Sequence, residues 1–394
     1  MKINFEDNVF LKKHINSILN FYNRNAFDSQ GGFFHRFLDD GKILDKDSRH
    51  LVSSTRFVFN YVNAFLMTKN YKYLNWAQHG IDYLISAHKN KDTNHYYWQI
   101  SKEKIIDSRA MTYGHAFVML AGASAMRVGL KDGNNLLRDM WNFLNQYFWE
   151  EDFNAYADER DASLKLLNSY RGQNANMHSV EALLASFEAT KNERFLERCE
   201  IIANQFVINL AEKSGGQIWE HYTSDWKIDW EYNKLKPDDT FKPWGFQPGH
   251  QVEWAKLLLQ IDEYMPKSWH KEKAIYLFDR AIKMGMDKKY GGIFYGYSPE
   301  GKVTNENKYF WVQAEAIAAA WRLYKVTNDE KYYNYYNLLW KWCWDHFIDH
   351  KFGGWYCILN RKGEKITNEK SPLGKTDYHT MGACWDIIKI NNNS

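Results

Sequence analysis

The sequence predicts an all-α fold, a closed ring of six helix pairs called an (α/α)6 barrel, with short β-hairpins between the pairs. Three observations predict it. An aromatic motif recurs six times along the 394 residues, turn residues follow it in several units, and an apolar helix comes next. The motif begins near residues 31, 95, 153, 215, 291 and 353, so each unit has room for two helices and a hairpin of ordinary length.

The repeated motif is a pair of glycines followed by aromatic residues. It reads Gly31-Gly32-Phe33-Phe34 in the first unit, and the units that begin near 215, 291 and 353 keep the glycines. The second and third units keep only the aromatic character, at residues 95–98 and 153–156. Turns flanked by short apolar segments predict β-hairpins. These turns lie at residues 39–42, 299–302 and 361–364.

An apolar helix and then a more amphipathic helix, such as residues 73–84, are predicted after each turn. The apolar helices belong inside the ring and the amphipathic ones outside. No Pro- or Ser-rich linker interrupts the pattern, which predicts a single catalytic domain over residues 1–394. An open solenoid is the alternative, but solenoid repeats are shorter and usually lack hairpins. The inner helices are expected at residues 57–67, 116–126, 180–189, 252–261, 314–324 and 381–388.

The composition argues against several classes of partner. The 51 basic and 48 acidic residues leave a formal charge of +3, which gives no electrostatic reason to bind nucleic acid or an anionic membrane surface. No apolar run reaches the roughly 18 residues that span a bilayer. Residues 1–7 carry charges where a signal peptide has its apolar stretch, and the four cysteines form no C-x-x-C pair. These features predict a cytoplasmic protein.

Polar and aromatic side chains stand at or near the start of every predicted inner helix. In a closed barrel these positions converge on one end of the ring, and the helix N-termini point at the same pocket. One such residue is explained by helix capping, but agreement among six units predicts a binding site. The residues are Arg56, Tyr113, His115, Asn174, Asn176, His178, His250, Glu253, Trp311, Gln313, Glu315, Tyr378 and His379.

The residue types in this ring favour proton-transfer chemistry on a sugar. Imidazole takes and returns protons near neutral pH, so His250 and His379 are the candidate acid–base groups. Arg56 and the helix N-termini are suited to stabilise an enediolate oxygen. Glu253, three residues after His250, is placed to orient the imidazole or to bind a sugar hydroxyl. Zinc held by His178, His250 and His379 is an alternative.

Four motifs resemble the N-acylglucosamine 2-epimerase superfamily, and the likeness covers nearly the whole chain. It is closest to the branch of isomerases that act on mannose or sulfoquinovose. The motifs lie at residues 53–57, 170–178, 243–254 and 375–382.

The resemblance implies a 1,2-isomerisation through a cis-enediolate, without a metal or another cofactor. It implies that His379 moves the proton between C2 and C1 and that His250 assists ring opening and proton exchange at the oxygens. The substrate is then a free monosaccharide, with D-mannose converted to D-fructose and lyxose to xylulose as a side reaction. The residues expected to hold the sugar are Arg56, Tyr113, Asn174, His178, Glu253 and Trp311.

Other reactions and classes stay open at this stage. Within the family, the alternatives are 2-epimerisation of mannose or of a disaccharide end, and isomerisation of sulfoquinovose. Lys242 stands where many relatives are expected to have arginine, and Lys375 stands where the sulfoquinovose branch is expected to have glutamine. Both changes weaken the match to sulfoquinovose, although two lysines near the mouth would attract a sulfonate. A glycoside hydrolase needs two well-placed carboxylates, and the convergent groups are mainly imidazoles. A non-catalytic sugar-binding protein is the third class, and the sequence does not indicate an oligomeric state.

Overall fold

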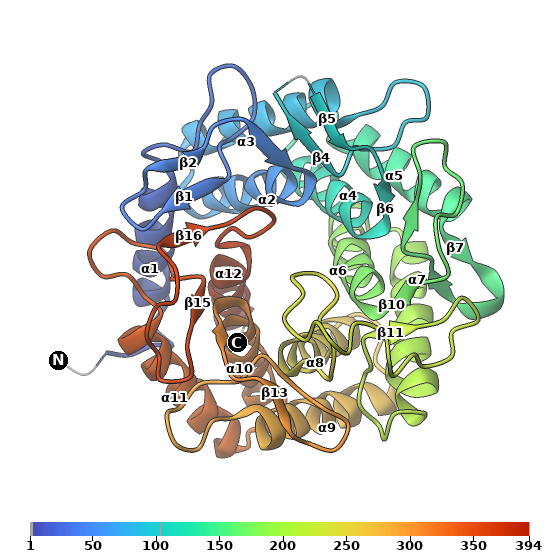
Figure 1. The fold of residues 1–394 in the computed structure, drawn as a ribbon. Coiled ribbons are helices and arrows are strands. Elements are labelled where there is room, and N and C mark those ends of the chain that lie inside the picture. The colour runs from blue at the N-terminus through green and yellow to red at the C-terminus, as the bar shows by residue number, and fades with distance from the viewer. Residues whose placement is uncertain (1–2, 103, 394) are drawn as a thin grey trace.

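A computed structural model describes residues 3–102 and 104–393, and twelve α-helices in these residues form an inner and an outer ring (Figure 1). This arrangement is the predicted barrel. Met1 and Lys2, part of the N-terminal segment used to predict a cytoplasmic location, lie outside the described residues. The inner helices are α2 (Leu51–Thr68), α4 (Thr112–Arg127), α6 (Gln173–Thr190), α8 (Pro248–Asp262), α10 (Phe310–Thr327) and α12 (Tyr378–Asn393). The outer helices are α1 (Asn8–Tyr22), α3 (Tyr71–Tyr83), α5 (Gly133–Tyr147), α7 (Glu193–Ala203), α9 (Ser268–Gly285) and α11 (Glu330–His346).

Each inner helix packs against the next one along the chain, and α12 packs against α2, which closes the ring. The expected order, inner helix followed by outer helix, holds in five units and fails in the sixth, because the described chain ends with the inner helix α12. The first helix, α1, fills the missing outer position beside α12. The side-chain amide of Asn8 donates a hydrogen bond to the side-chain oxygen of Asn392 at 3.1 Å, so the first and last helices of the described chain meet here.

The inner helices begin three to seven residues earlier than the apolar pattern indicates. The first turn of each inner helix carries polar side chains that face the barrel end. A prediction based on the spacing of apolar residues leaves such a turn out of the helix. At the first turn of α8, Pro248 supplies a backbone angle suited to a helix start. A Cβ at the next residue, Gly249, would lie 2.5 Å from the indole of Trp311, so only glycine lets this indole rest against the helix start.

Short strands link neighbouring units around one end of the barrel. The segment in front of each inner helix pairs with the unit that follows it, through β3–β4, β6–β9, β10–β11, β14–β15, β16–β1 and a single bridge between Phe246 and Tyr297. These pairs fix the height at which each inner helix starts. The strands are β1 (Arg36–Leu38), β2 (Ile43–Asp45), β3 (Ser48–His50), β4 (Gln99–Ser101), β5 (Lys104–Asp107), β6 (Ala110–Met111), β7 (Trp149–Glu150), β8 (Ala155–Tyr156), β9 (Glu159–Arg160), β10 (Arg171–Gly172), β11 (His221–Tyr222), β12 (Gly296–Tyr297), β13 (Val303–Asn305), β14 (Lys308–Tyr309), β15 (Ile358–Leu359) and β16 (Glu369–Ser371).

The predicted hairpins form at two of the three turns. Strands β1 and β2 pair across residues 39–42, and β12 and β13 pair across residues 299–302. At the third turn, residues 361–364, only a single bridge joins Leu359 to Lys365. Strand β15 pairs instead with β14 of the preceding unit. Its backbone groups therefore form the link between units.

A repeated ion pair joins the aromatic loop of a unit to the strand in front of its inner helix. In four units an acidic residue near the loop contacts a basic residue 21 positions later, and these basic residues are almost completely buried. The pair therefore ties the start of the inner helix to its own unit. The four pairs are Asp28–Arg49 at 2.6 Å, Glu150–Arg171 at 2.5 Å, Asp287–Lys308 at 3.2 Å and Asp349–Lys370 at 2.6 Å.

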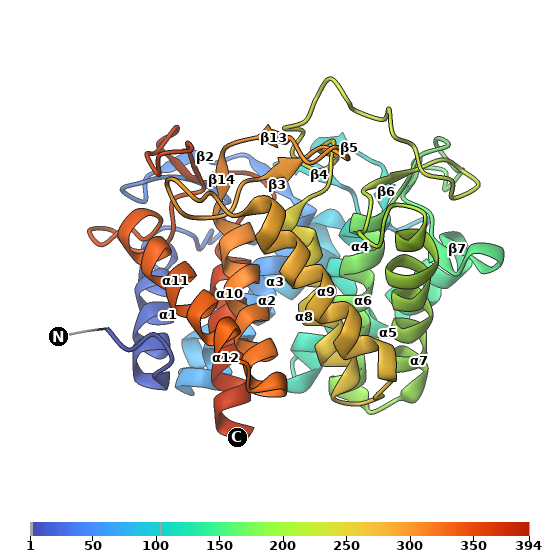
Figure 2. The same ribbon diagram turned by 90° about the horizontal axis from the view of Figure 1, so that it is seen from below.

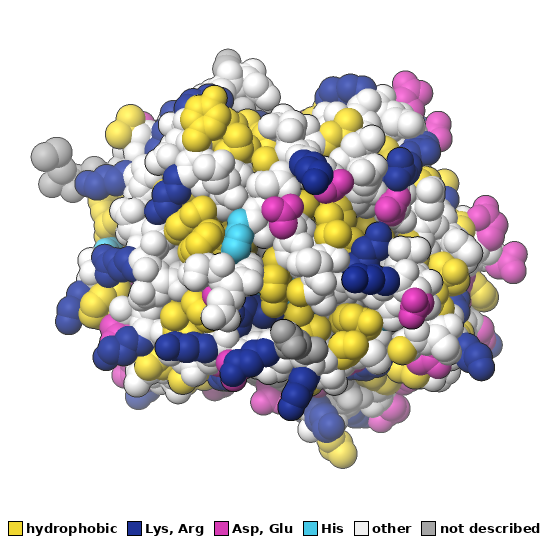
Figure 3. Space-filling model, turned by 90° about the horizontal axis from the view of Figure 1, so that it is seen from above, with side chains coloured by type: hydrophobic (Ala, Val, Ile, Leu, Met, Phe, Trp, Pro, Cys, Tyr) yellow, Lys and Arg dark blue, Asp and Glu magenta, His cyan; other side chains and the backbone are white. Residues whose placement is uncertain are grey.

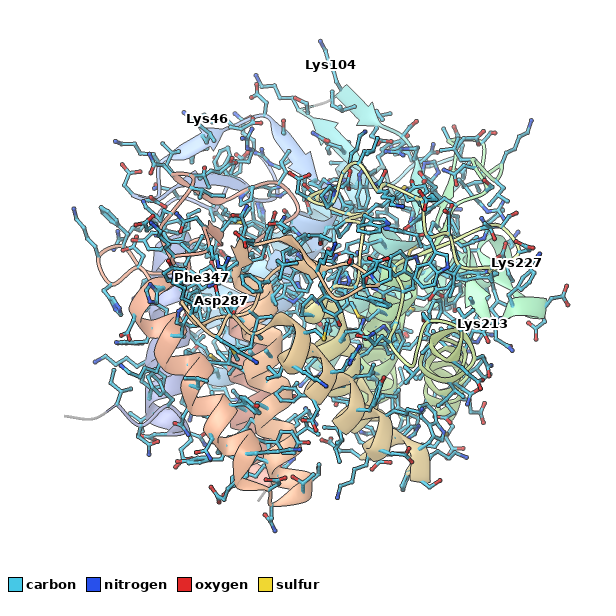
Figure 4. All side chains as sticks on the ribbon, turned by 60° about the horizontal axis from the view of Figure 1, so that its bottom comes forward. Lys46, Lys104, Lys213, Lys227, Asp287 and Phe347 are labelled. Atoms are coloured by element: carbon cyan, nitrogen blue, oxygen red, sulfur yellow. The ribbon has the colours of Figure 1, made fainter. Side chains whose placement is uncertain are left out.

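The outer surface carries charges of both signs. On the side shown in Figure 3, Lys and Arg side chains alternate with Asp and Glu side chains, in keeping with a formal charge of +3. Exposed lysines such as Lys104 and Lys227 point away from the barrel at its periphery, whereas Asp287 and Phe347 are buried beneath the loops (Figure 4). None of the helices in the described residues is long and apolar enough to cross a membrane.

We expect Lys370→Met to lower the free energy of unfolding by about 3 kcal/mol, because it leaves the Asp349 carboxylate buried without its counter-ion. The substitution also removes hydrogen bonds to the carbonyl oxygens of Gly353 and Asp39. Urea denaturation followed by circular dichroism measures the effect. The matched control is Lys227→Met, which breaks an exposed pair with Asp225. Equal denaturation midpoints for the two variants would contradict a stabilising role of the repeated pair.

Candidate active site

The polar ends of five inner helices meet at a small cavity inside the barrel end. Seven of the eight residues predicted to form a site line this cavity, and the eighth, Arg56, lies beside it and contacts two of them. The roles assigned to these residues remain predictions. The lining residues are Tyr113, Asn174, His178, Thr240, Phe241, Pro243, His250, Glu253, Tyr295, Trp311, Lys375 and His379.

The imidazole of His250 is held by a carboxylate from its own unit, just before β11. Its Nδ1 lies 2.9 Å from both carboxylate oxygens of Glu220, and this carboxylate also accepts a hydrogen bond from the amide of Gln173 at 2.9 Å. The amide nitrogen of Gln173 also lies 2.9 Å from Nδ1. Of these two neighbours only the carboxylate can accept a hydrogen, so the Nδ1–H tautomer pairs with Glu220 and leaves the lone pair at Nε2. The expectation that Glu253 orients this imidazole is wrong, because Glu220 occupies the Nδ1 side.

The imidazole of His379 is held in the same way by Glu315. Its Nδ1 lies 2.7 Å from Glu315 Oε1, and its Nε2 lies 3.3 Å from the guanidinium of Arg56. Burial, reinforced by the positive charge of Arg56, holds the pKa of His379 well below its ordinary value. The ring is therefore neutral at neutral pH, which is the state required of a base.

Trp311 lies between the two candidate bases. Its ring centroid is 5.0 Å from that of His250 and 5.8 Å from that of His379. Both imidazoles therefore face one cavity, next to a flat aromatic surface of the kind that packs against the C–H face of a sugar. The ring centroid of the third imidazole, His178, is 6.3 Å from that of His379. Its Nδ1 lies 2.9 Å from Glu181 Oε2, within hydrogen-bond distance.

Several polar atoms around the cavity are buried without a protein partner. They include both carboxylate oxygens of Glu253, the amide oxygen of Asn174 and the indole nitrogen of Trp311. The nearest histidine nitrogen to Glu253 belongs to His178 and is 3.9 Å away, beyond hydrogen-bond distance. Burial, followed by the charge of Glu315, raises the pKa of Glu253 well above its ordinary value, so this group is suited to donate to a hydroxyl. A polyhydroxylated ligand would supply the partners that these atoms lack.

The loop between β11 and α8 covers the cavity. Its Phe241 ring stacks on His50 at 5.7 Å and contacts Trp98 at 5.5 Å, and the remaining cavity of 20 Å³ has room for roughly one water molecule. The loop therefore limits the space available to a substrate above the imidazoles. The long irregular segment between β11 and α8 has no periodic spacing of apolar residues, so the sequence did not predict that Phe241 lines the cavity.

The two lysines noted in the sequence have different surroundings. Lys242 lies outside the cavity, where its ammonium contacts Glu159 at 2.8 Å and the ring of Tyr170 at 4.0 Å. Lys375 lines the cavity, and burial together with the charge of Arg56 lowers its pKa to about 8. Only one of the two lysines is therefore available to a substrate in the cavity.

Two groups of described side chains bring potential metal-binding atoms within 4.8 Å of one another, and both include Glu253. The first group adds His178 and Glu181, and the second adds Glu315 and His379. Hydrogen bonds already engage the histidine Nδ1 atoms, and the Lys256 ammonium contacts Glu315. A divalent cation at the second group would meet the charge of Lys256, so the arrangement fits a hydrogen-bonded acid–base network better than a metal centre.

Sequence reasoning missed Glu220 and Lys256 and recognised Glu315 only as a carboxylate in the ring. Glu220 follows the fourth aromatic motif directly, so its position next to a repeated element was the available signal. Lys256 lies six residues after His250 inside an apolar helix, where a lysine is unusual unless it is paired.

We expect His250→Asn and His379→Asn each to lower kcat by about 10²- to 10⁴-fold, the contribution typical of a general acid or base. The measurement is turnover of D-mannose, with circular dichroism to establish that each variant folds. His350→Asn is the control, because this exposed ring bonds only to the carbonyl of Trp344 at the outer surface. A variant at position 250 or 379 that keeps wild-type turnover would remove that histidine from the chemistry.

In the described residues, the twelve-helix barrel and its two carboxylate-bound imidazoles form a site of the kind that suits acid–base chemistry on a polyhydroxylated ligand. The family model for N-acylglucosamine 2-epimerase (GlcNAc 2-epimerase) matches residues 32–383. The chain belongs to this family, and the resemblance seen in the four sequence motifs is confirmed.

Named relatives and solved structures agree with this assignment. A protein of Marinomonas mediterranea named D-mannose isomerase is 47% identical over 386 residues, which cover 98% of each chain. A crystal structure of a D-mannose isomerase matches with a TM-score of 0.97 at 47% identity, over 99% of this chain and 100% of that one. The cellobiose 2-epimerase of Bacillus thermoamylovorans B4167 matches with a TM-score of 0.87 at 20% identity, over 98% and 100% of the two chains, and shows the fold alone.

Proposed function

We propose that this chain is a metal-independent aldose–ketose isomerase that interconverts D-mannose and D-fructose. One observation carries the proposal: His250 and His379 face a common cavity, and a carboxylate holds each ring by Nδ1 so that Nε2 is directed away from it. The relatives named D-mannose isomerase support the choice of sugar.

The geometry accounts for each proton that must move. His379 Nε2 takes the proton from C2 of the open-chain aldose and returns it to C1, while His250 carries a proton from O2 to O1. The guanidinium of Arg56, which lies 3.3 Å from His379 Nε2, stabilises the enediolate oxygen between the two transfers. The double bond passes from C1–O1 through C1–C2 to C2–O2, so the product is the ketose and no electrons enter or leave.

The site favours this reaction over hydrolysis of a glycoside. Among the described residues that line the cavity, Glu253 is the only carboxylate, whereas hydrolysis needs an acid and a second carboxylate. Glu315 lies beneath His379 and is engaged by that ring and by Lys256.

The small cavity also favours a monosaccharide over a disaccharide end. Phe241 narrows one side of it, where its ring packs against Tyr113 at 6.1 Å as well as His50 and Trp98. As the sequence predicts, we place the enzyme in the cytoplasm, with a free monosaccharide as its substrate.

We expect chelator-treated enzyme to convert D-mannose to D-fructose at an undiminished rate, because the acid–base groups are all side chains of this chain. Product analysis by NMR in deuterated water reports the sugar formed and the position of the label. Glucose as the sole product would make the enzyme a 2-epimerase. Loss of turnover after chelation, restored by added metal, would contradict the metal-independent mechanism. A higher kcat/KM for sulfoquinovose than for mannose would replace the proposed substrate.

We expect Phe241→Ala to raise the ratio of kcat/KM for β-1,4-mannobiose to that for mannose by roughly tenfold, because it opens the closed side of the cavity. The reducing-end unit of mannobiose is mannose, so the same chemistry reports the change. Phe241→Tyr, which keeps the ring, is the control. An unchanged ratio in the alanine variant would show that Phe241 does not limit the size of the substrate.

A further inference from the structure

Lys256 is a buried cation that the proposed reaction does not use. It lies on α8, three residues after Glu253, and only 8% of its surface is exposed. Its ammonium contacts Glu315 Oε2 and interacts electrostatically with Glu253 and Glu181. Burial alone would lower the pKa of Lys256, but these carboxylates raise it above its ordinary value, so the ammonium stays charged.

Lys256 is the cation that most favours the ionised form of Glu315, which it contacts directly. Only 3% of the Glu315 surface is exposed, and burial leaves its pKa above the ordinary value even though Lys256, the largest opposing influence, lowers it. Removing the ammonium would leave Glu315 near Glu181 and Glu253 with no cation in direct contact, and the carboxyl would then take up a proton.

Glu315 and Arg56 act on the two nitrogens of His379 from opposite sides. An ionised Glu315 accepts from Nδ1–H across 2.7 Å, and Nε2 then keeps its lone pair, 3.3 Å from the Arg56 guanidinium. A protonated Glu315 would donate to Nδ1 instead, and the hydrogen of the neutral ring would move to Nε2, where it would displace the contact with Arg56. That tautomer presents a donor to the sugar where the reaction needs a base.

We propose that Lys256 is a positioning residue that keeps Glu315 ionised and thereby keeps the lone pair of His379 at Nε2, directed at the sugar. The inference rests on the proposed role of His379 as the base. Lys256 is not among the described residues that line the cavity, and its direct contact is with Glu315.

Other charged and titratable groups surround this pair from every neighbouring inner helix. Arg56 on α2 faces His379 from the cavity side, and Tyr378 precedes it on α12. His178 and Glu181 on α6 and Glu253 on α8 belong to the same cluster, and Asp386 on α12 interacts electrostatically with Lys256. None of these groups combines a positive charge with direct contact to Glu315. Lys256 does, so the test concentrates on that residue.

The kinetic test compares Lys256→Gln with the charge-conserving Lys256→Arg in the conversion of mannose to fructose. We expect the glutamine variant to lose about tenfold or more in kcat at pH 7 with little change in KM, because the defect lies in the base and not in sugar binding. Without the ammonium the pKa of Glu315 rises. The acidic limb of kcat/KM therefore moves upward by about one pH unit or more, and activity recovers as the pH rises. Lys256→Arg should keep the wild-type profile.

A double-mutant cycle with Glu315→Gln asks whether Lys256 acts through this carboxylate. Because the glutamine at 315 cannot ionise, adding Lys256→Gln should change kcat by less than about twofold. A loss of kcat in Lys256→Gln that is equal at all pH values would overturn the proposal. A kcat of the double variant that falls by the product of the two single losses would also overturn it.

Selective ¹⁵N labelling of histidine provides a readout that does not depend on the sugar or on turnover. The His379 signals, assigned by their loss in His379→Asn, should show the Nδ1–H tautomer in the wild-type enzyme and the Nε2–H tautomer in Lys256→Gln at pH 7. If the glutamine variant does not fold, an Nε2–H tautomer in the wild-type enzyme or in Lys256→Arg overturns the inference. An inactive wild-type enzyme with the expected tautomers would instead remove the proposed function and leave the role of Lys256 intact.

Discussion

The height at which each inner helix begins is the constraint on which the site depends. Strand pairs link each unit to the next around the barrel end, and in four units a buried ion pair joins the same segment to its own aromatic loop. The backbone hydrogen bonds are obligatory in this buried layer, so the helix starts cannot slide along the axis. Side chains separated by up to 323 residues, such as Arg56 and His379, therefore reach one cavity.

Within that frame, burial determines the chemical state of the site. The same loss of water that lowers the pKa of His379 raises that of Glu253, so one cavity holds a neutral base beside a neutral acid. Carboxylates behind the rings then select the tautomers, since Glu220 and Glu315 each occupy an Nδ1. This combination of groups is suited to move protons between positions of a sugar, as proposed above.

The inner helices and the loop between β11 and α8 contribute differently to the cavity. The inner helices supply the reactive groups, whereas the irregular loop before α8 sets the space available above them through Phe241. Chains with this fold can therefore share a set of imidazoles and differ in the size of sugar that they admit, because a loop changes without disturbing the strand pairs beneath it.

The sequence by itself determined the barrel and most of the cavity lining. A sixfold repeat places equivalent residues at equivalent helix starts, so His250, His379 and Trp311 were recognisable by position alone. Only the tertiary structure decided which carboxylate holds which imidazole, that Phe241 closes the cavity, and that α1 completes the last helix pair. Glu315 and His379 come from different units and lie 64 positions apart, whereas Glu220 and His250 lie 30 positions apart within one unit and are brought together by the chain between β11 and α8. Hydrophobic spacing along the chain carries no information about either pair, because the closure of the ring forms one contact and the path of an irregular loop forms the other.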